Sequence, residues 1–150
     1  RLDEFLKIRR DNAEMLLTEL ADLQEYLILP THHKKCTPSW FGFLISVKDT
    51  APFTKQQLVE YLESHGIGTR QLFAGNLLRQ PMMTTNDIPI RVGTGKIKLS
   101  SAVNQTDYNA LPVTDFIMNN TFWVGVAQNV TVEDMKQTSE IFHNFIRENC

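Results

Sequence analysis

The stretch from residue 65 to residue 83, HGIGTRQLFAGNLLRQPMM, combines glycines and arginines at a spacing that could bind an anion. Gly66 and Gly68 permit positive φ angles and a close approach of the backbone to a ligand. Arg70 and Arg79 carry planar guanidinium groups, which suit a carboxylate or a phosphate. No acidic residue lies within this stretch to pair with either arginine, so we expect Arg70 to be left open for a ligand.

Two further side chains of the stretch suit a sugar or a base. Phe73 offers a ring for stacking, and Asn76 offers both a hydrogen-bond donor and an acceptor. We therefore predict that Arg70, Phe73, Asn76 and Arg79 bind substrate, and that at least Arg70 and Asn76 point toward one open face. Composition alone leaves an alternative open, in which the stretch is a strand edge whose arginines form surface ion pairs.

Other clusters favour structure over chemistry. His32, His33 and Cys36 lie in one polar loop and are too few for a structural zinc site, so we predict no metal. The glycines of RVGTGK lack the spacing of a phosphate-binding loop and predict a turn. Two cysteines are too few for a disulfide framework, which favours a reducing, cytoplasmic setting. We find no catalytic residue in this sequence.

Length and charge bound the remaining possibilities. The 150 residues suit one domain, and a net charge of −2 gives no basic field for nucleic acid. No apolar run approaches the roughly 18 residues of a membrane span, and no signal peptide is recognisable. We therefore expect neither nucleic acid nor a membrane as a partner.

Three segments carry helical signals. Residues 1–23 show an amphipathic helical pattern that starts without an initiator methionine or a cap, so we expect a helix that belongs to a longer protein. Thr54 and Gln57 form a capping box for a helix that ends near residue 64. A second capping box at Thr131 begins the final helix.

Two apolar segments predict strands. Residues 40–48 and 121–126 are aromatic and β-branched, and the first should be buried on both faces at its start. We predict both in one sheet, with a core formed by Phe41, Phe43, Ile45, Leu58, Leu62, Phe122, Val124, Phe142 and Phe145. Residues 84–112 are turn-rich and predict a long excursion or hairpin, while helices alternating with strands predict an α/β (α+β) layer domain over 24–150.

A family resemblance extends over most of residues 1–83 and 113–150. The motifs WFGF, HGIGTRQLFAGNLLRQP and TDFIMNNTFWVGV occur in this order, before a terminal amphipathic helix. Together they resemble the C-terminal domain of the vitamin B6-dependent sugar 3-dehydratases in the DegT/DnrJ/EryC1/StrS family. Within this family the sequence is most similar to the CDP-6-deoxy-L-threo-D-glycero-4-hexulose 3-dehydrases. Residues 84–112 depart from the family pattern, which leaves open what that segment contacts.

The resemblance implies the small domain of a fold type I aminotransferase scaffold, with a small sheet covered by helices. It also implies that the helix over residues 1–23 links this domain to an absent N-terminal large domain. It implies pyridoxamine or pyridoxal phosphate (PMP/PLP) held mainly by an absent large domain, so cofactor-binding residues in this sequence are unknown. That domain would also carry the residue acting on the substrate and, in CDP-sugar enzymes, cysteines for a [2Fe–2S] cluster. The implied substrate is a nucleotide-activated 4-keto-6-deoxy sugar, and the implied full-length protein is a homodimer. This segment alone would be inactive and would line the substrate site.

Two alternatives remain beside the dehydratase. The related aminotransferases usually carry Tyr-Pro and then Pro-Leu-His after the Gly-Thr-Arg strand, and neither occurs here, which favours the dehydratase branch. A sugar-nucleotide aminotransferase fragment is the second reading. A free-standing α/β module that binds a ligand without catalysis is the third.

Overall fold

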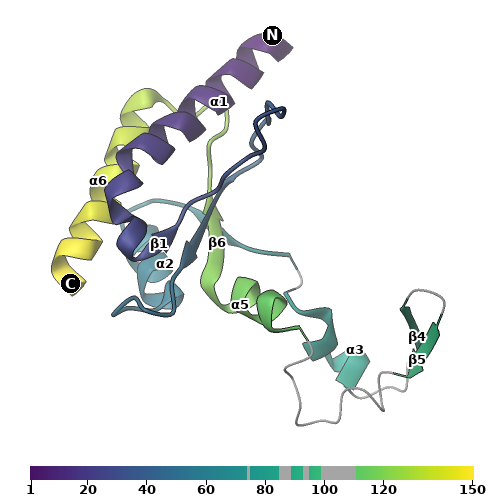
Figure 1. Ribbon diagram of the computed structural model, residues 1–150. Helices are drawn as coiled ribbons and strands as arrows, with labels where there is room; N and C mark the ends of the chain where they lie inside the picture. Colours follow the sequence, from purple (N-terminus) through teal and green to yellow (C-terminus); the bar gives the residue numbers. More distant parts are fainter. Residues whose placement is uncertain (74, 85–88, 93–94, 99–110) are drawn as a thin grey trace. The chain divides into compact units, whose positions relative to one another are not determined.

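The computed structural model describes residues 1–73, 75–84, 89–92, 95–98 and 111–150 of the chain (Figure 1). Its residues group into two compact units. Unit 1 comprises Arg1–Gln71 and Asn120–Cys150, and unit 2 comprises Leu72–Asn119.

Unit 1 contains three α-helices and one 3₁₀ helix: α1 (Leu2–Glu19), η1 (Ala21–Glu25), α2 (Lys55–Ser64) and α6 (Val132–Asn149). The expected helix over residues 1–23 is therefore an α-helix continued by a 3₁₀ segment. Its apolar stripe is buried at Leu16 and Leu20, whereas Leu2 is 70% exposed. No helix in the described part of the chain is long and apolar enough to cross a membrane.

Short-range hydrogen bonds set the start of two helices, as the sequence predicts. Thr54 and Gln57 form the capping box of α2, in which each side chain bonds the other residue's backbone amide. Thr131 and Asp134 form the same arrangement at α6. Gly66, at φ +82°, lies just beyond the end of α2, in the left-handed region that glycine adopts without strain.

The sheet of unit 1 has the strand order β1–β2–β6–β3, and all three pairings are antiparallel. Its strands are β1 (Leu27–Ile28), β2 (Phe43–Val47), β6 (Thr121–Val124) and β3 (Thr69–Gln71). Ile45 lies opposite Phe122, so the two predicted strands do share a sheet. Both are shorter than the apolar runs that predicted them.

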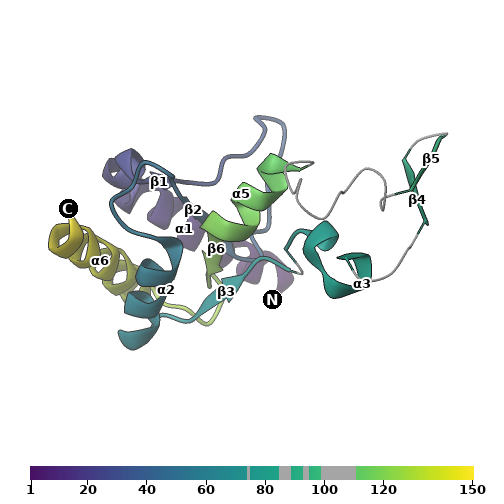
Figure 2. The same ribbon diagram turned by 90° about the horizontal axis from the view of Figure 1, so that it is seen from below.

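One face of this sheet forms the core with the helices. α6 packs against both α1 and α2, and Figure 2 shows it flanked by the two. The inward side chains of β2 and β6 are almost completely buried beneath these helices. The prediction of the core is confirmed for eight of its nine residues: Phe43, Ile45, Leu58, Leu62, Phe122, Val124, Phe142 and Phe145.

The prediction that the segment is buried on both faces at its start is wrong. Phe41 is 67% exposed and Leu44, on β2, is 40% exposed. Successive side chains of a strand point to opposite faces, and the helices of unit 1 cover the face that Phe43 and Ile45 occupy. An apolar sequence on both faces therefore does not mean that both faces are covered.

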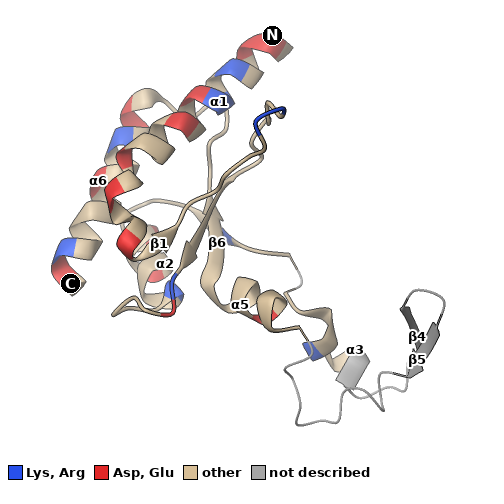
Figure 3. Cartoon of the chain, in the orientation of Figure 1, with Lys and Arg blue, Asp and Glu red and all other residues tan. Residues whose placement is uncertain are grey.

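The connection between β1 and β2 lies beside α1. Arg9 donates a hydrogen bond of 3.1 Å to the carbonyl of Trp40, and Arg10 donates one of 3.2 Å to the carbonyl of Pro38. His32 and Cys36 are exposed in this connection, whose tip carries lysines (Figure 3). Within the described residues, no three His, Cys, Asp or Glu side chains come together to hold a metal.

Unit 2 contains short elements: η2 (Leu77–Arg79), α3 (Pro81–Thr84), β4 (Pro89–Val92), β5 (Gly95–Lys98) and α5 (Pro112–Asn120). β4 and β5 pair as an antiparallel hairpin, one of the two forms expected within residues 84–112. The rest of that segment, 85–88, 93–94 and 99–110, lies outside the described residues. α5 begins at Pro112, because the fixed φ of proline suits a first helical turn.

Phe43 is buried and Phe41 is exposed, so the same substitution should affect stability to different extents at the two positions. We expect Phe43→Ala to lower the free energy of unfolding by about 3–5 kcal/mol, because it leaves a cavity in the core. Phe41→Ala should cost less than about 1 kcal/mol, because its ring is largely exposed. Urea denaturation of both variants measures the difference, and equal losses would contradict this description of the sheet.

Candidate functional site

The four residues predicted to bind substrate are divided between the two units. Arg70 lies on β3 in unit 1, with its side chain exposed. Phe73, Asn76 and Arg79 lie in unit 2, before and within η2. Phe73 is 77% exposed, whereas Asn76 is only 2% exposed.

The expectation that Asn76 points toward an open face is wrong. Its Oδ1 accepts a hydrogen bond of 3.0 Å from the backbone amide of Leu78, which caps η2. Its Nδ2 donates one of 2.8 Å to Oδ1 of Asp115. A buried amide must satisfy both its donor and its acceptor, and these two bonds do so within the protein.

Arg79 has an acidic partner, although none lies near it in the sequence. Its Nε donates to Oδ1 of Asp115 at 2.6 Å, and its Nη2 donates to Oδ2 at 2.6 Å. This two-point geometry is the strong form of an arginine–carboxylate contact. The partner comes from α5, so the absence of acidic residues within 65–83 did not leave Arg79 unpaired.

The backbone beside Asn76 is fitted closely to α5. Gly75 has φ +61°, a value that favours glycine. A Cβ atom added there would lie 2.7 Å from Sδ of Met118, and the amide of Asn76 donates to the same sulfur at 3.2 Å. The positive φ and the lack of space for a Cβ atom both require glycine at position 75. This close approach lets Asn76 and Arg79 reach Asp115 of α5.

The contacts of Asp115 change its acidity. The hydrogen bond from Arg79 is the largest cause and that from Asn76 the second; together they lower the pKa of Asp115 from 3.8 to about 2. The carboxylate is thus ionised at neutral pH, and it holds Arg79 in one orientation.

Sequence reasoning missed two residues of interest, Asp115 and Trp123. Asp115 gave no signal beyond its place in a helical segment, because its partners lie 36 and 39 residues earlier. Trp123 lies in the apolar strand but was not among the predicted core residues and was given no role; its half-buried ring lies on the outer face of the sheet.

Each unit contains a cavity among its described residues. In unit 2, a cavity of about 450 Å³ has apolar walls that include Leu77, Leu78 and Leu111. In unit 1, an open cavity of about 480 Å³ lies between η1 and α6.

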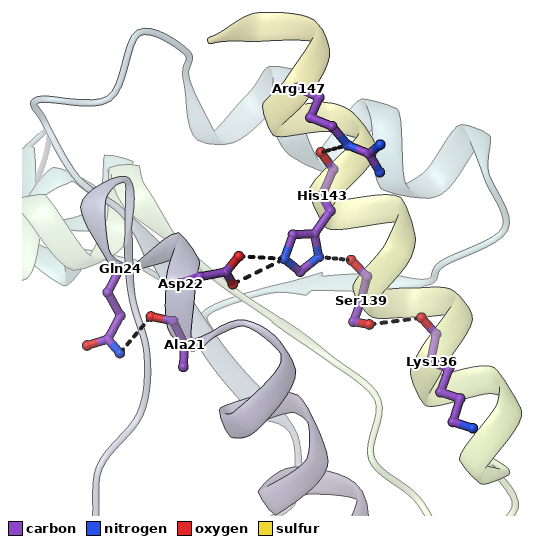
Figure 4. A network of polar contacts seen from close by, with 7 residues as sticks. All are labelled: Ala21, Asp22, Gln24, Lys136, Ser139, His143 and Arg147. Atoms are coloured by element: carbon purple, nitrogen blue, oxygen red, sulfur yellow. Dashed lines mark hydrogen bonds and ion pairs between the residues drawn. The ribbon is translucent and has the colours of Figure 1, made fainter.

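The cavity of unit 1 contains a polar network (Figure 4). Both oxygens of Asp22 lie 3.1 Å from Nε2 of His143, and Nδ1 of His143 lies 2.7 Å from the carbonyl oxygen of Ser139. Both ring nitrogens therefore face oxygen acceptors of the protein itself. The network joins α6 to η1 and uses up the hydrogen-bonding capacity of the histidine.

Neither of these two cavities has the lining of a pyridoxal phosphate site. Such a site needs a lysine or histidine at the reactive carbon, an acidic or basic partner for the ring nitrogen, and donors for the phosphate. Neither of the two cavities contains a lysine, and the histidine in one is engaged by Asp22 and Ser139. We therefore assign no cofactor contact within the described residues of this chain.

Comparison with solved structures defines the class of fold. The chain matches Escherichia coli GDP-4-keto-6-deoxy-D-mannose-3-dehydratase, solved with bound hydrated PLP, with a TM-score of 0.67 and 25% identity. That match covers 93% of this chain and 31% of the other. Streptomyces venezuelae DesV, solved with a ketimine intermediate, matches with a TM-score of 0.72 at 15% identity over 97% of this chain and 33% of the other. The chain thus has the small α/β fold found in PLP-dependent enzymes of the aminotransferase type.

The family follows from the sequence. Residues 1–143 match the model of the DegT/DnrJ/EryC1/StrS aminotransferase family, and the chain belongs to that family. It is 37% identical to the lipopolysaccharide biosynthesis protein RfbH of Salmonella typhimurium, over 97% of this chain and 29% of that protein. It is 33% identical to dTDP-4-dehydro-2,6-dideoxy-D-glucose 3-dehydratase of Saccharopolyspora spinosa, over 97% of this chain and 28% of that protein. The chain therefore spans less than a third of the length of these relatives.

The contacts of Asp115 predict a measurable titration. The carboxyl carbon of Asp115 should titrate in NMR spectra with a midpoint near the lowered pKa of about 2, and Arg79→Ala should raise that midpoint toward 3.8. Because the folded-state pKa is lowered, any stabilisation by this pair is present above pH 3.8 and is lost as the pH falls toward 2. Arg147→Ala, on α6, is the control and should leave the midpoint unchanged; an unchanged midpoint in Arg79→Ala would contradict the pairing.

Proposed function

We propose that this chain is the C-terminal part of a PMP/PLP-dependent nucleotide-sugar 3-dehydratase. The enzyme would remove the C3 hydroxyl of a 4-keto-6-deoxy sugar nucleotide during the biosynthesis of dideoxysugars, such as those of lipopolysaccharide. The names of the relatives carry this proposal: a dTDP-sugar 3-dehydratase matches along nearly the whole chain, and one lipopolysaccharide biosynthesis protein matches equally far. Two GDP-4-keto-6-deoxy-D-mannose 3-dehydratases, from Escherichia coli and Yersinia pseudotuberculosis, match 53% of it.

The site motif supports the dehydratase branch. Gly68-Thr-Arg70 is followed by Gln-Leu-Phe, without the Tyr-Pro and Pro-Leu-His elements usual in the related aminotransferases. The nearby Asn76 and Arg79 are held by Asp115. The absence of both elements supports the dehydratase branch over the aminotransferase branch.

The chain's own residues would bind the substrate, while chemistry on the cofactor would be carried out by residues outside it. The exposed guanidinium of Arg70 would bind a phosphate, and the exposed ring of Phe73 would pack against the sugar or base. Asp115 would fix the orientation of Arg79, with Asn76 as a positioning residue. A [2Fe–2S] cluster and a homodimeric assembly of the full-length protein belong to the same proposal.

A second candidate function is a sugar-nucleotide aminotransferase. The family carries the aminotransferase name, and solved aminotransferases share the fold, for example one from Psychrobacter cryohalolentis with a TM-score of 0.67 at 14% identity over 99% of this chain and 36% of the other. The acting residue, lysine or histidine, separates the two functions. A non-catalytic binding module is the third possibility and would show neither reaction.

The full-length protein distinguishes these functions by its product. Incubated with PMP and with CDP-, GDP- or dTDP-linked 4-keto-6-deoxy sugars, a dehydratase yields a product that has lost the C3 oxygen. An aminotransferase supplied with PLP and glutamate yields an amino sugar, and a binding module yields neither. Mass spectrometry of the products decides, and the 150-residue chain alone should be inactive.

Arg70→Ala in the full-length enzyme tests the role of this residue. We expect kcat/KM to fall by about tenfold or more, because a charge-assisted contact to phosphate is lost. The melting temperature should hardly change, because Arg70 is exposed. The matched control is Arg147→Ala, which should alter neither quantity. A large loss of stability with normal kinetics would show that Arg70 is structural.

A further inference from the structure

The outer face of the sheet in unit 1 carries an apolar surface. Ile28 of β1, Leu44 of β2 and Trp123 of β6 contribute side chains to it, and Phe41 precedes β2 beside them. Neither β2 nor β6 contains a charged residue, and Figure 3 shows the ribbon of β6 without charge colours. Contiguous exposed apolar surface of this kind marks a binding surface more often than chance exposure does.

The centre of this face is an aromatic pair fixed by a glycine. A Cβ atom added to Gly42 would lie 2.1 Å from Cε3 of Trp123, so the indole lies directly over the backbone of residue 42. The ring of Phe41 is 5.0 Å from that of Trp123, centroid to centroid, at an interplanar angle of 53°. The ring of Phe41 is thus left open for stacking by another flat, apolar group, with the tilted ring of Trp123 beside it.

A cation of the sheet borders the aromatic pair. Arg70 of β3 lies directly opposite Trp123 of β6 in the antiparallel ladder. Its side chain is exposed, and it makes no hydrogen bond or ion pair with any of the residues that the structure describes. The hydroxyl of Thr69, the preceding residue on the same strand, donates a hydrogen bond to the carboxylate of Glu63. The guanidinium of Arg70 is therefore available to bind an anion.

We propose that this face binds the nucleoside diphosphate portion of the substrate. The base would stack on Phe41 and Trp123, and a phosphate would be bound by the guanidinium of Arg70. Aromatic stacking accepts any base, since every base has a π face, which suits relatives named for both GDP- and dTDP-sugars. The assignment rests on the proposed function, because that function supplies the nucleotide.

The charge pattern favours a nucleotide over a second copy of the chain. In a twofold contact the same surface lies on both subunits, so one interface would contain two Arg70 guanidinium groups, whose like charges repel. The outward residues of this face include no acidic side chain to offset that repulsion. A flat base linked to phosphate matches both the apolar and the cationic part of the face.

Fluorescence of the 150-residue chain tests this site without cofactor or catalysis. The chain contains two tryptophans, so a Trp40→Phe background leaves Trp123 as the reporter. We expect GDP and dTDP to quench it, and Phe41→Ala and Arg70→Ala each to weaken GDP binding by about tenfold. Phe41→Ala should weaken binding of guanosine but not of pyrophosphate, and Arg70→Ala should do the reverse. The matched controls are Leu2→Ala, equally exposed, and Arg147→Ala, and both should bind GDP normally.

Three results would overturn the assignment: no quenching by either nucleotide, unchanged GDP affinity in both variants, or sedimentation showing self-association that Phe41→Ala abolishes. Circular dichroism establishes that each variant is folded. The outcome is separable from the proposed function. If the full-length enzyme dehydrates its substrate and Phe41→Ala leaves KM unchanged, the nucleotide site is wrong and the proposed function still holds. GDP binding by this face without any dehydration would do the opposite.

Discussion

The antiparallel pairing of β2 with β6 is the constraint on which the rest of unit 1 depends. It joins residues 43–47 to residues 121–124, segments more than seventy positions apart, as in the bond of 2.6 Å between Ser46 and Thr121. Once the register places Ile45 opposite Phe122, alternation assigns every neighbouring side chain to a face. The buried face then binds the helices, and Leu44 and Trp123 must lie outside.

The two units are ordered by different interactions. Unit 1 is held by apolar burial, with α6 contributing Phe142 and Phe145 to a core that the sheet and helices share. In unit 2 the contacts around Asp115 are polar and directional, joining η2 to α5 by three hydrogen bonds to one carboxylate. A carboxylate in this arrangement specifies orientation sharply, because both of its oxygens have fixed donors.

The accuracy of the sequence analysis follows the distance over which each feature is determined. Both capping boxes were predictable because three residues decide them, and the strands because their apolar runs are long. Asn76 and the pairing of Arg79 were not, since their partner lies on a helix whose neighbours no local pattern reveals. The prediction for Phe41 failed for a related reason. Hydrophobicity indicates a tendency toward burial, but whether one or both faces of a sheet are covered is decided by the whole fold.

The segment between β3 and β6 starts and ends at neighbouring points. Gln71 is the register partner of Phe122, so the sheet itself holds together the two ends from which residues 72–119 extend. The entropy of closing a flexible loop grows by only about 0.6 kcal/mol for each doubling of its length, and here the sheet fixes the closure. A change of length in this segment that spares the contacts of Asp115 therefore costs the sheet of unit 1 little, because the ladder keeps its register.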